Sequence, residues 1–352
     1  MTEYGRRSRV NLYPLIRPFA LALDAEQAHR ATIAALRLAP KRRPPEFPPS
    51  LRTRVAGIDF ASPIGLAAGF DKDAEVPEHM LGFGFGFVEV GTVTPRPQQG
   101  NPKPRLFRLV RDGAVINRLG FNNAGQPAAF ERLLQCSHSR GPIGVNIGAN
   151  KSSKDRIADY VAGVRAMSPV ARYLTINISS PNTPGLRGLQ DEGALDELLA
   201  AVQQARSGKP VFLKVAPDFQ EGDPERIVSA AIDHKIDGVI VSNTTIQRPS
   251  LRSRHAGEAG GLSGAPLKPL ALDALRRFRR ASGGAIPLIG VGGIASADDA
   301  WERIRAGASL VQLYTAMVYE GPGIARRIAN GLAQRVRAAG FDNVAEAVGS
   351  EG

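Results

Sequence analysis

The chain has 352 residues, is 43% apolar, carries a formal net charge of +12 and contains one cysteine, Cys136. This length and apolar content can bury a large core, whereas one cysteine excludes a disulfide framework or a zinc site within a single chain. The basic residues are spread along the chain, which argues against nucleic-acid binding and leaves three explanations: attraction to an anionic membrane surface, attraction to an anionic substrate, or a compositional bias without function.

Residues 1–50 are predicted to form a small helical extension followed by a linker. The apolar segment at 12–23 is interrupted by Pro14, Arg17 and Pro18, so we expect a short helix and neither a secretory signal nor a membrane-spanning helix. Asp24 with Gln27 predicts the N-cap of a second helix, which the prolines at 44–45 end. The helix pair either packs on the main domain or lies on a bilayer with its apolar face down.

Residues 51–345 are predicted to form a parallel (β/α)₈ TIM barrel, an α/β fold, with residues 346–352 as a C-terminal tail. A doubly wound sheet is the rival, but residues 65–69 lack the Gly-rich dinucleotide fingerprint that it requires. Continuous apolar runs without alternation indicate strands covered on both faces. The expected strands are 63–67, 85–90, 143–147, 174–178, 211–215, 238–241, 287–291 and 310–313, and the expected helices include 154–166, 192–206, 224–234, 268–280, 297–306 and 322–338.

The predicted strands end in amides and lysines, which in a barrel face the active site. No histidine or metal-ligand cluster is among them, so we expect neither a metal site nor a hydrolase. Amides and ammonium groups can bind the polar edge of a planar heterocycle, and a lysine beside a flavin stabilises negative charge on it. Gly292 and Gly293 follow the seventh strand, where such barrels bind phosphate, and Gly264 can close the site from the side. Together these features suggest FMN.

The segment at 177–183, NISSPNT, is the most specific one. Ser180 can act as a general base, with Thr183 or a water molecule passing the proton on, while Asn177 and Asn182 hold a substrate by hydrogen bonds. The alternative is a Ser/Pro/Asn turn without a chemical role. A second segment at 117–123 can present polar groups to a small ligand, or is an Asn-rich turn before the helix expected at Gln126.

The chain resembles dihydroorotate dehydrogenase in a series of segments that occur in order between about residues 60 and 320. It resembles the quinone-dependent, membrane-associated type in particular, because Ser180 stands where the soluble type has cysteine and because the extension contains YPLIRPFALALDAEQAHR. The segments are GLAAGFDKDAE, GFVEVGTVTPRPQQGNPKPRLFRL, INRLGFNN, GVNIG, NISSPNTPGLR, SNTT, GGLSG, IGVGGI and LVQLYTAM.

The resemblance implies oxidation of dihydroorotate to orotate in pyrimidine biosynthesis by a peripheral enzyme on the cytoplasmic face of a bacterial cell membrane. It implies no nucleic-acid partner and no obligate protein partner. It assigns FMN to Ala68, Gly69, Phe70, Asp71, Lys72, Thr92, Asn146, Asn177, Lys214, Ser242, Gly264, Gly293, Tyr314 and Thr315. It assigns the substrate to Lys72, Asn117, Arg118, Leu119, Gly120, Phe121, Asn177, Asn182, Asn243 and Thr244, and a quinone tunnel to His29, Arg108 and Tyr314.

Two other functions remain as alternatives. The chain can be another FMN-dependent barrel reductase that acts on a different pyrimidine or uses NAD(P)H, although no additional NAD or iron–sulfur domain is visible in the sequence. From a different class, it can be a basic nucleic-acid-binding protein, which would retain DNA in a salt-sensitive way without a flavin spectrum.

Overall fold

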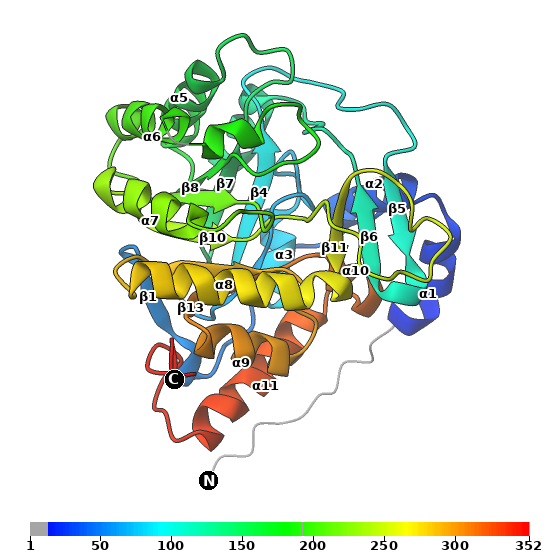
Figure 1. The fold of residues 1–352 in the computed structure, drawn as a ribbon. Coiled ribbons are helices and arrows are strands. Elements are labelled where there is room, and N and C mark those ends of the chain that lie inside the picture. The colour runs from blue at the N-terminus through cyan, green and yellow to red at the C-terminus, as the bar shows by residue number, and fades with distance from the viewer. Residues whose placement is uncertain (1–12, 192, 352) are drawn as a thin grey trace.

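The computed structural model describes residues 13–191 and 193–351. In this part of the chain, eight parallel strands close into a barrel with helices around it (Figure 1), which confirms the predicted (β/α)₈ fold. Each strand overlaps one of the eight predicted runs, because an apolar strand buried on both faces is recognisable from its sequence. In order around the barrel the strands are β3 (Ile64–Leu66), β4 (Phe87–Val93), β7 (Ile143–Ile147), β8 (Tyr173–Asn177), β9 (Val211–Val215), β10 (Gly238–Val241), β12 (Leu288–Val291) and β13 (Ala308–Leu313).

The helices after the strands bury one apolar face each against the barrel. Residue 192, the first of a predicted helix, lies outside the described residues, and that helix is observed from Ala194. Two short helices lie outside the ranges that were predicted, α3 (Pro77–Phe83) and α10 (Thr315–Glu320), and α10 directly follows β13. The outer helices are α3 (Pro77–Phe83), α4 (Gln126–Leu134), α5 (Arg156–Met167), α6 (Ala194–Ala205), α7 (Asp223–Asp233), α8 (Lys268–Ser282), α9 (Ala297–Arg305) and α11 (Ile324–Ala338).

Aromatic side chains fill the amino-terminal end of the barrel. A hairpin of β1 (Thr53–Val55) and β2 (Ile58–Phe60) brings Phe60 edge-on to Phe87, with ring centroids 5.1 Å apart. A Cβ atom on Gly65 would lie 2.2 Å from the Phe87 ring, so the strand requires glycine at this position. This end is therefore closed, and a ligand must enter from the other end.

A small antiparallel sheet lies beside the carboxyl end of the barrel. Its strands are β5 (Leu106–Leu109), β6 (Ala114–Asn117) and β11 (Gly261–Gly264), with β6 in the middle. It contacts α10 and the second helix of the extension, and the three strands and the two helices lie together in Figure 1. The sequence analysis predicted none of these strands, although they wall the entrance to the barrel.

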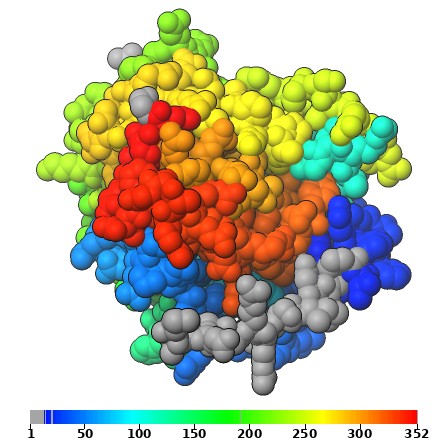
Figure 2. Space-filling model, turned by 90° about the horizontal axis from the view of Figure 1, so that it is seen from below, coloured from blue at the N-terminus to red at the C-terminus, as the bar shows by residue number. Residues whose placement is uncertain are grey.

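The extension forms two helices, α1 (Tyr13–Ala22) and α2 (Ala25–Leu38). Leu12, which was expected in the first helix, lies outside the described residues. Asp24 caps α2 as predicted, because its Oδ1 accepts hydrogen bonds from the backbone N–H groups of Glu26 and Gln27, both at 3.0 Å. Figure 2 shows the two helices at one edge of the molecule, next to the segment around α10.

The extension exposes several large apolar side chains, on α1, in the turn after it and at the end of α2. Leu15 and Phe19 are 71% and 75% exposed, and Leu23 and Leu38 are exposed as well. None of the helices within residues 13–191 and 193–351 combines the length and the hydropathy that crossing a membrane requires.

The segment after α11 returns to the barrel. Val344 and Ala347 are buried, and Glu351 forms an ion pair with Arg276 of α8.

Candidate active site

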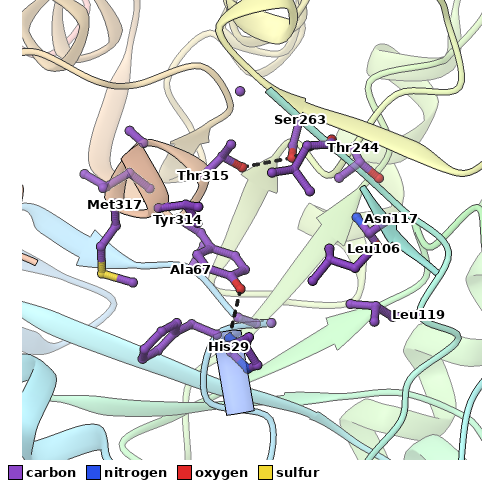
Figure 3. A pocket seen from close by; sticks show the side chains of 18 of the residues that line it. His29, Ala67, Leu106, Asn117, Leu119, Thr244, Ser263, Tyr314, Thr315 and Met317 are labelled. Carbon is purple, nitrogen blue, oxygen red and sulfur yellow. Dashed lines mark hydrogen bonds between the residues drawn. The ribbon is translucent and has the colours of Figure 1, made fainter. Parts of the chain in front are cut away.

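One cavity of about 680 Å³ starts at the carboxyl ends of the barrel strands and continues between α1, α2 and α10. Its size is in the range of sites for cofactors and small ligands. We call the part at the strand ends the polar half and the part between the helices the apolar half. Figure 3 shows the region where the two meet, with Asn117 and Thr244 on one side and His29, Tyr314 and Met317 on the other.

Three side chains from neighbouring strands hydrogen-bond to one another at the floor of the polar half. Thr92 Oγ1 donates to Asn146 Oδ1 at 2.6 Å, and Asn177 Nδ2 donates to both atoms, at 3.1 and 3.0 Å. Asn177 Oδ1 in turn accepts from Ser179 Oγ at 2.9 Å and from Asn243 Nδ2 at 3.4 Å. Thr92, Asn177 and Asn243 line the cavity, whereas Asn146 lies directly beneath them.

A fully buried carboxylate on β4, Glu89, fixes the orientation of these amides. Asn146 Nδ2 donates to Glu89 Oε1 at 2.8 Å, so Asn146 Oδ1 must face Thr92 and Asn177. Gln312 Nε2, Thr175 Oγ1 and Tyr173 OH donate to Glu89 Oε2 at 2.9, 3.1 and 3.3 Å. The sequence analysis missed Glu89, and the available signal was a single acidic residue inside an otherwise apolar predicted strand.

Two lysines bring positive charge into the polar half. Lys72 and Lys214 both line the cavity, and no carboxylate oxygen of the described residues lies within 4.0 Å of either ammonium group. Burial lowers the pKa of Lys72 to about 8, against the opposing charges of Asp73 and Glu26. Burial also lowers the pKa of Lys214, against the opposing charge of Glu89. Buried cations without an anionic partner are unfavourable, so the cavity favours an anionic ligand.

Ser180 lies at the cavity wall, in the turn that follows β8. It is 5% exposed, and its Oγ accepts a hydrogen bond from the Asn182 backbone N–H at 3.3 Å. The Asn182 side chain lies opposite Asn117 on β6, to whose Oδ1 it donates at 3.2 Å. Thr183 is buried behind the turn and does not line the cavity, and its Oγ1 has no hydrogen-bond partner among the described residues.

Glycines shape the far end of the polar half. Gly293 has φ +71°, and a Cβ atom there would lie 2.8 Å from the backbone nitrogen of Lys268, so the loop packs tightly on the start of α8. Gly264 has φ +98°, and a Cβ atom there would lie 2.4 Å from the carbonyl oxygen of Gly113. Beside it, Thr315 Oγ1 donates to Ser263 Oγ at 2.9 Å (Figure 3). The backbone N–H of Gly293 has no acceptor among the described residues.

Besides Asn146 and Thr183, two predicted site residues, Asp71 and Arg118, have side chains that do not line the cavity. Asp71 is buried and accepts from the backbone N–H groups of Glu75 and Val76, at 2.7 and 2.8 Å, while burial raises its pKa to about 6. Arg118 forms an ion pair with Glu258 at 2.8 Å. The cavity is lined by the remaining residues predicted for FMN and substrate, namely Ala68, Gly69, Phe70, Asn117, Leu119, Gly120, Phe121, Asn182, Ser242, Thr244, Tyr314 and Thr315.

His29 and Tyr314 lie where the polar half meets the apolar half. Tyr314 and His29 point toward each other (Figure 3), with 3.5 Å between Tyr314 OH and His29 Nδ1. Phe70 packs edge-on against both rings. Burial and the charge of Lys72 lower the pKa of His29 to about 3, so the imidazole is neutral at physiological pH. Arg108 also lines the cavity and donates to the carbonyl oxygen of Leu23.

Most side chains that line the apolar half beyond these residues are apolar, although Tyr13, Thr32, Tyr319 and Glu320 also line it. Its walls come from α1, α2, α3 and α10, and the chain segments that carry them are far apart in the sequence. Members of this wall are Ile16, Leu21, Ala28, Leu36, Phe83 and Met317.

A buried ion pair that the sequence analysis missed joins the extension to the barrel. Glu26 on α2 and Arg105 are both almost fully buried, with Nη2–Oε1 and Nε–Oε2 distances of 2.7 and 3.0 Å. Arg105 also donates to the carbonyl oxygens of Gln99 and Asn101. Asn101 donates through Nδ2 to the carbonyl oxygen of Asn182, so these contacts reach the turn that carries Ser180.

Comparisons with known proteins agree with this architecture. The family model for dihydroorotate dehydrogenase matches residues 50–336. A protein of Erythrobacter litoralis described as dihydroorotate dehydrogenase (quinone) is 64% identical over 97% of this chain and 100% of its own length. A protein of Novosphingobium aromaticivorans with the same description is 63% identical over 96% of this chain and 99% of its own length. The crystal structure of DHODH from Eimeria tenella in complex with ferulenol superposes with a TM-score of 0.89, at 41% identity, over 93% of this chain and 95% of that chain.

Proposed function

Because the chain belongs to the dihydroorotate dehydrogenase family, we propose that it oxidises dihydroorotate to orotate, with FMN as the hydride acceptor and a membrane quinone as the final electron acceptor. This reaction is a step of pyrimidine biosynthesis. The observation that supports the proposal best is the single cavity, which joins a polar half rich in amides and lysines to an apolar half between the N-terminal helices.

The residues of the polar half fit FMN. Lys72 and Lys214 supply ammonium groups without carboxylate partners for the electron-rich edge of the ring system, and Asn177 and Thr92 supply hydrogen bonds beside them. The tightly packed loop at Gly293, whose N–H has no acceptor among the described residues, fits the phosphate. When bound, FMN accepts the hydride from the substrate ring.

Ser180 is the proposed base that removes the proton from the carbon next to the dihydroorotate carbonyl. Its position on the cavity wall supports this role, and the buried Thr183 hydroxyl, which lacks a partner among the described residues, suits a group that carries the proton away. A serine hydroxyl is a weak base, so the site must stabilise the negative charge that develops on the substrate. Lys72 binds the carboxylate, and Asn117, Asn182 and Asn243 donate to the ring oxygens.

The apolar half is the proposed route of the quinone. Its walls are apolar side chains of α1, α2 and α10, and the exposed Leu15 and Phe19 continue the apolar surface outward from it. A helix pair of this kind binds in the interface of a bilayer, and the net charge of +12 favours anionic lipids. We propose peripheral attachment to the cytoplasmic face of a bacterial cell membrane, with the apolar half opening into the bilayer.

An absorbance spectrum of the purified protein, recorded anaerobically before and after addition of dihydroorotate, tests the proposal. We expect a flavin spectrum that dihydroorotate bleaches and that a soluble quinone analogue restores. Bleaching by NADPH but not by dihydroorotate would favour the alternative reductase. A colourless protein that does not take up FMN would contradict the proposal.

A further inference from the structure

A fully buried arginine, Arg303 on α9, lies behind the Gly292–Gly293 loop. It is 0% exposed and does not line the cavity. Its Nη2 donates to the carbonyl oxygen of Gly292 at 3.0 Å and to that of Lys268, the first residue of α8, at 2.8 Å. One guanidinium nitrogen thus holds the loop and the start of α8 together, at the place where Gly293 and Lys268 pack most closely.

The bond to Gly292 determines where the next N–H group points. The Gly292–Gly293 peptide is trans, and in a planar trans peptide the C=O and N–H bonds point in opposite directions. Because the Gly292 carbonyl oxygen points toward Arg303, outside the cavity, the Gly293 N–H points away from Arg303. Gly292 and Gly293 both line the cavity, and the Gly293 N–H has no acceptor among the described residues.

The charge of Arg303 is not balanced by a neighbouring carboxylate. Of the three acidic residues of the same helix, Asp298 forms an ion pair with Arg335, and Asp299 and Glu302 form ion pairs with Lys268. No carboxylate oxygen of the described residues lies within 4.0 Å of the Arg303 guanidinium. Its Nε and Nη1 are buried without hydrogen-bond partners among those residues. Burial lowers the pKa of Arg303 to about 10, so the side chain remains charged at neutral pH. An anion on the other side of the loop would relieve this imbalance.

We propose that Arg303 is a positioning residue that makes this site selective for a phosphate monoester, so that the chain binds FMN in preference to riboflavin. It acts through the Gly292 carbonyl by aiming the Gly293 N–H at the phosphate, and its buried charge favours the same anion. The proposal rests on the proposed function, because it assigns the phosphate of FMN to this loop.

The test compares the affinities of FMN and riboflavin, measured by fluorescence quenching after the flavin has been removed from the full-length protein. In Arg303→Met, the donor is lost and we expect FMN affinity to fall about 10- to 100-fold, as for a hydrogen bond from a charged group. Riboflavin affinity should change less than about threefold, because it lacks the phosphate. Arg303→Lys, which keeps a charge and a donor, should recover part of the loss. Arg305→Met, on the same helix but partly exposed, is the matched control and should leave both affinities unchanged.

An equal fall in FMN and riboflavin affinity would overturn the proposal, because it would indicate a general packing defect. Unchanged FMN affinity in Arg303→Met would also overturn it. If Arg303→Met does not fold, the ratio of the two affinities in Arg303→Lys decides, and a ratio equal to that of the unaltered protein contradicts the proposal. Bleaching by dihydroorotate in the unaltered protein tests the proposed function separately, so the two failures are distinguishable.

Discussion

In the polar half of the cavity, side chains from β4, β7, β8 and β10 hydrogen-bond to one another above the buried Glu89, whereas the apolar half is lined by short helices without such bonds. The polar half is therefore held in one geometry by many distant parts of the chain, as a site for hydride and proton transfer requires. The helices of the apolar half are joined to the rest of the chain by a few separate contacts, such as Glu26–Arg105 and Tyr13 to the Val318 carbonyl oxygen, and their apolar walls suit a long apolar ligand that must enter and leave. Substitutions in the polar half should therefore affect reduction of the flavin by dihydroorotate, and substitutions in the apolar half should affect its reoxidation by quinone.

The largest difference between the two half-reactions is expected for Ser180→Ala. Loss of the base should slow bleaching of the bound flavin by dihydroorotate about 10²- to 10⁴-fold, while FMN stays bound. Stopped-flow absorbance measures this step directly, and reoxidation by quinone after chemical reduction should keep its rate. Ser168→Ala, at a buried serine outside the cavity, is the control. An unchanged bleaching rate would remove Ser180 from the role of base.

Ala28→Trp should have the opposite effect, impairing the reaction with quinone and not the reaction with dihydroorotate. Ala28 lines the apolar half from α2, and an indole there competes with a ligand for the same space. Overfilling an apolar site costs about 1–3 kcal/mol, so we expect KM for quinone to rise about 10- to 100-fold while bleaching by dihydroorotate is unaffected. Ala31→Trp, on the exposed face of the same helix, is the control. Equal effects on both half-reactions would show that the two halves are not independent.

The pH dependence of orotate binding tests the charge in the polar half. In the proposed complex the carboxylate of orotate binds to protonated Lys72, whose pKa in the free site is lowered by burial to about 8. Affinity should therefore be constant below this pKa and fall above it, by at most about tenfold per pH unit. Titration of the flavin spectrum measures it, and uracil, which has no carboxylate, should not show the fall. A fall for uracil of the same size would assign the effect to another group.

The smallest effect is expected for membrane attachment. Leu15→Ser removes one exposed apolar side chain of α1, and loss of about 1–2 kcal/mol of burial should weaken binding to anionic lipid vesicles about 5- to 30-fold. Sedimentation with vesicles of phosphatidylglycerol and phosphatidylcholine measures it. Ile246→Ser, at an apolar residue that is 57% exposed on a loop of the barrel, should bind as the unaltered protein does. Equal loss in both variants would contradict attachment through α1.

The sequence predicted the barrel better than the elements around it. Strands such as Ile143–Ile147 are continuous apolar runs, and their burial on both faces is visible without any knowledge of their partners. The strands of the small sheet have four residues each, and Gly261–Gly264 contains two glycines, so its pairing with β6 depends on contacts distant in sequence. The β1–β2 hairpin that closes the barrel was also not predicted, because its two strands have only three residues each.

The same difference holds within the site. Residues at strand ends could be predicted, because a barrel brings all such ends to one face, and most of them line the cavity. Glu89, Arg105 and Arg303 could not, because each acts inside an element or loop through a partner that only the tertiary structure supplies. The direction in which a side chain points could not be predicted either. Arg118, for example, points toward Glu258.

The ion pair between Glu26 and Arg105 makes the extension more than a route for one ligand. If only the Glu26 carboxylate were removed, the buried guanidinium of Arg105 would lose its partner, and breaking such a pair costs about 3–5 kcal/mol. The loop at Gln99 and Asn101 would lose its anchor, and with it the support of the turn that carries Ser180. The extension that walls the apolar half is thus also connected, through Arg105 and Asn101, to the turn at the polar half.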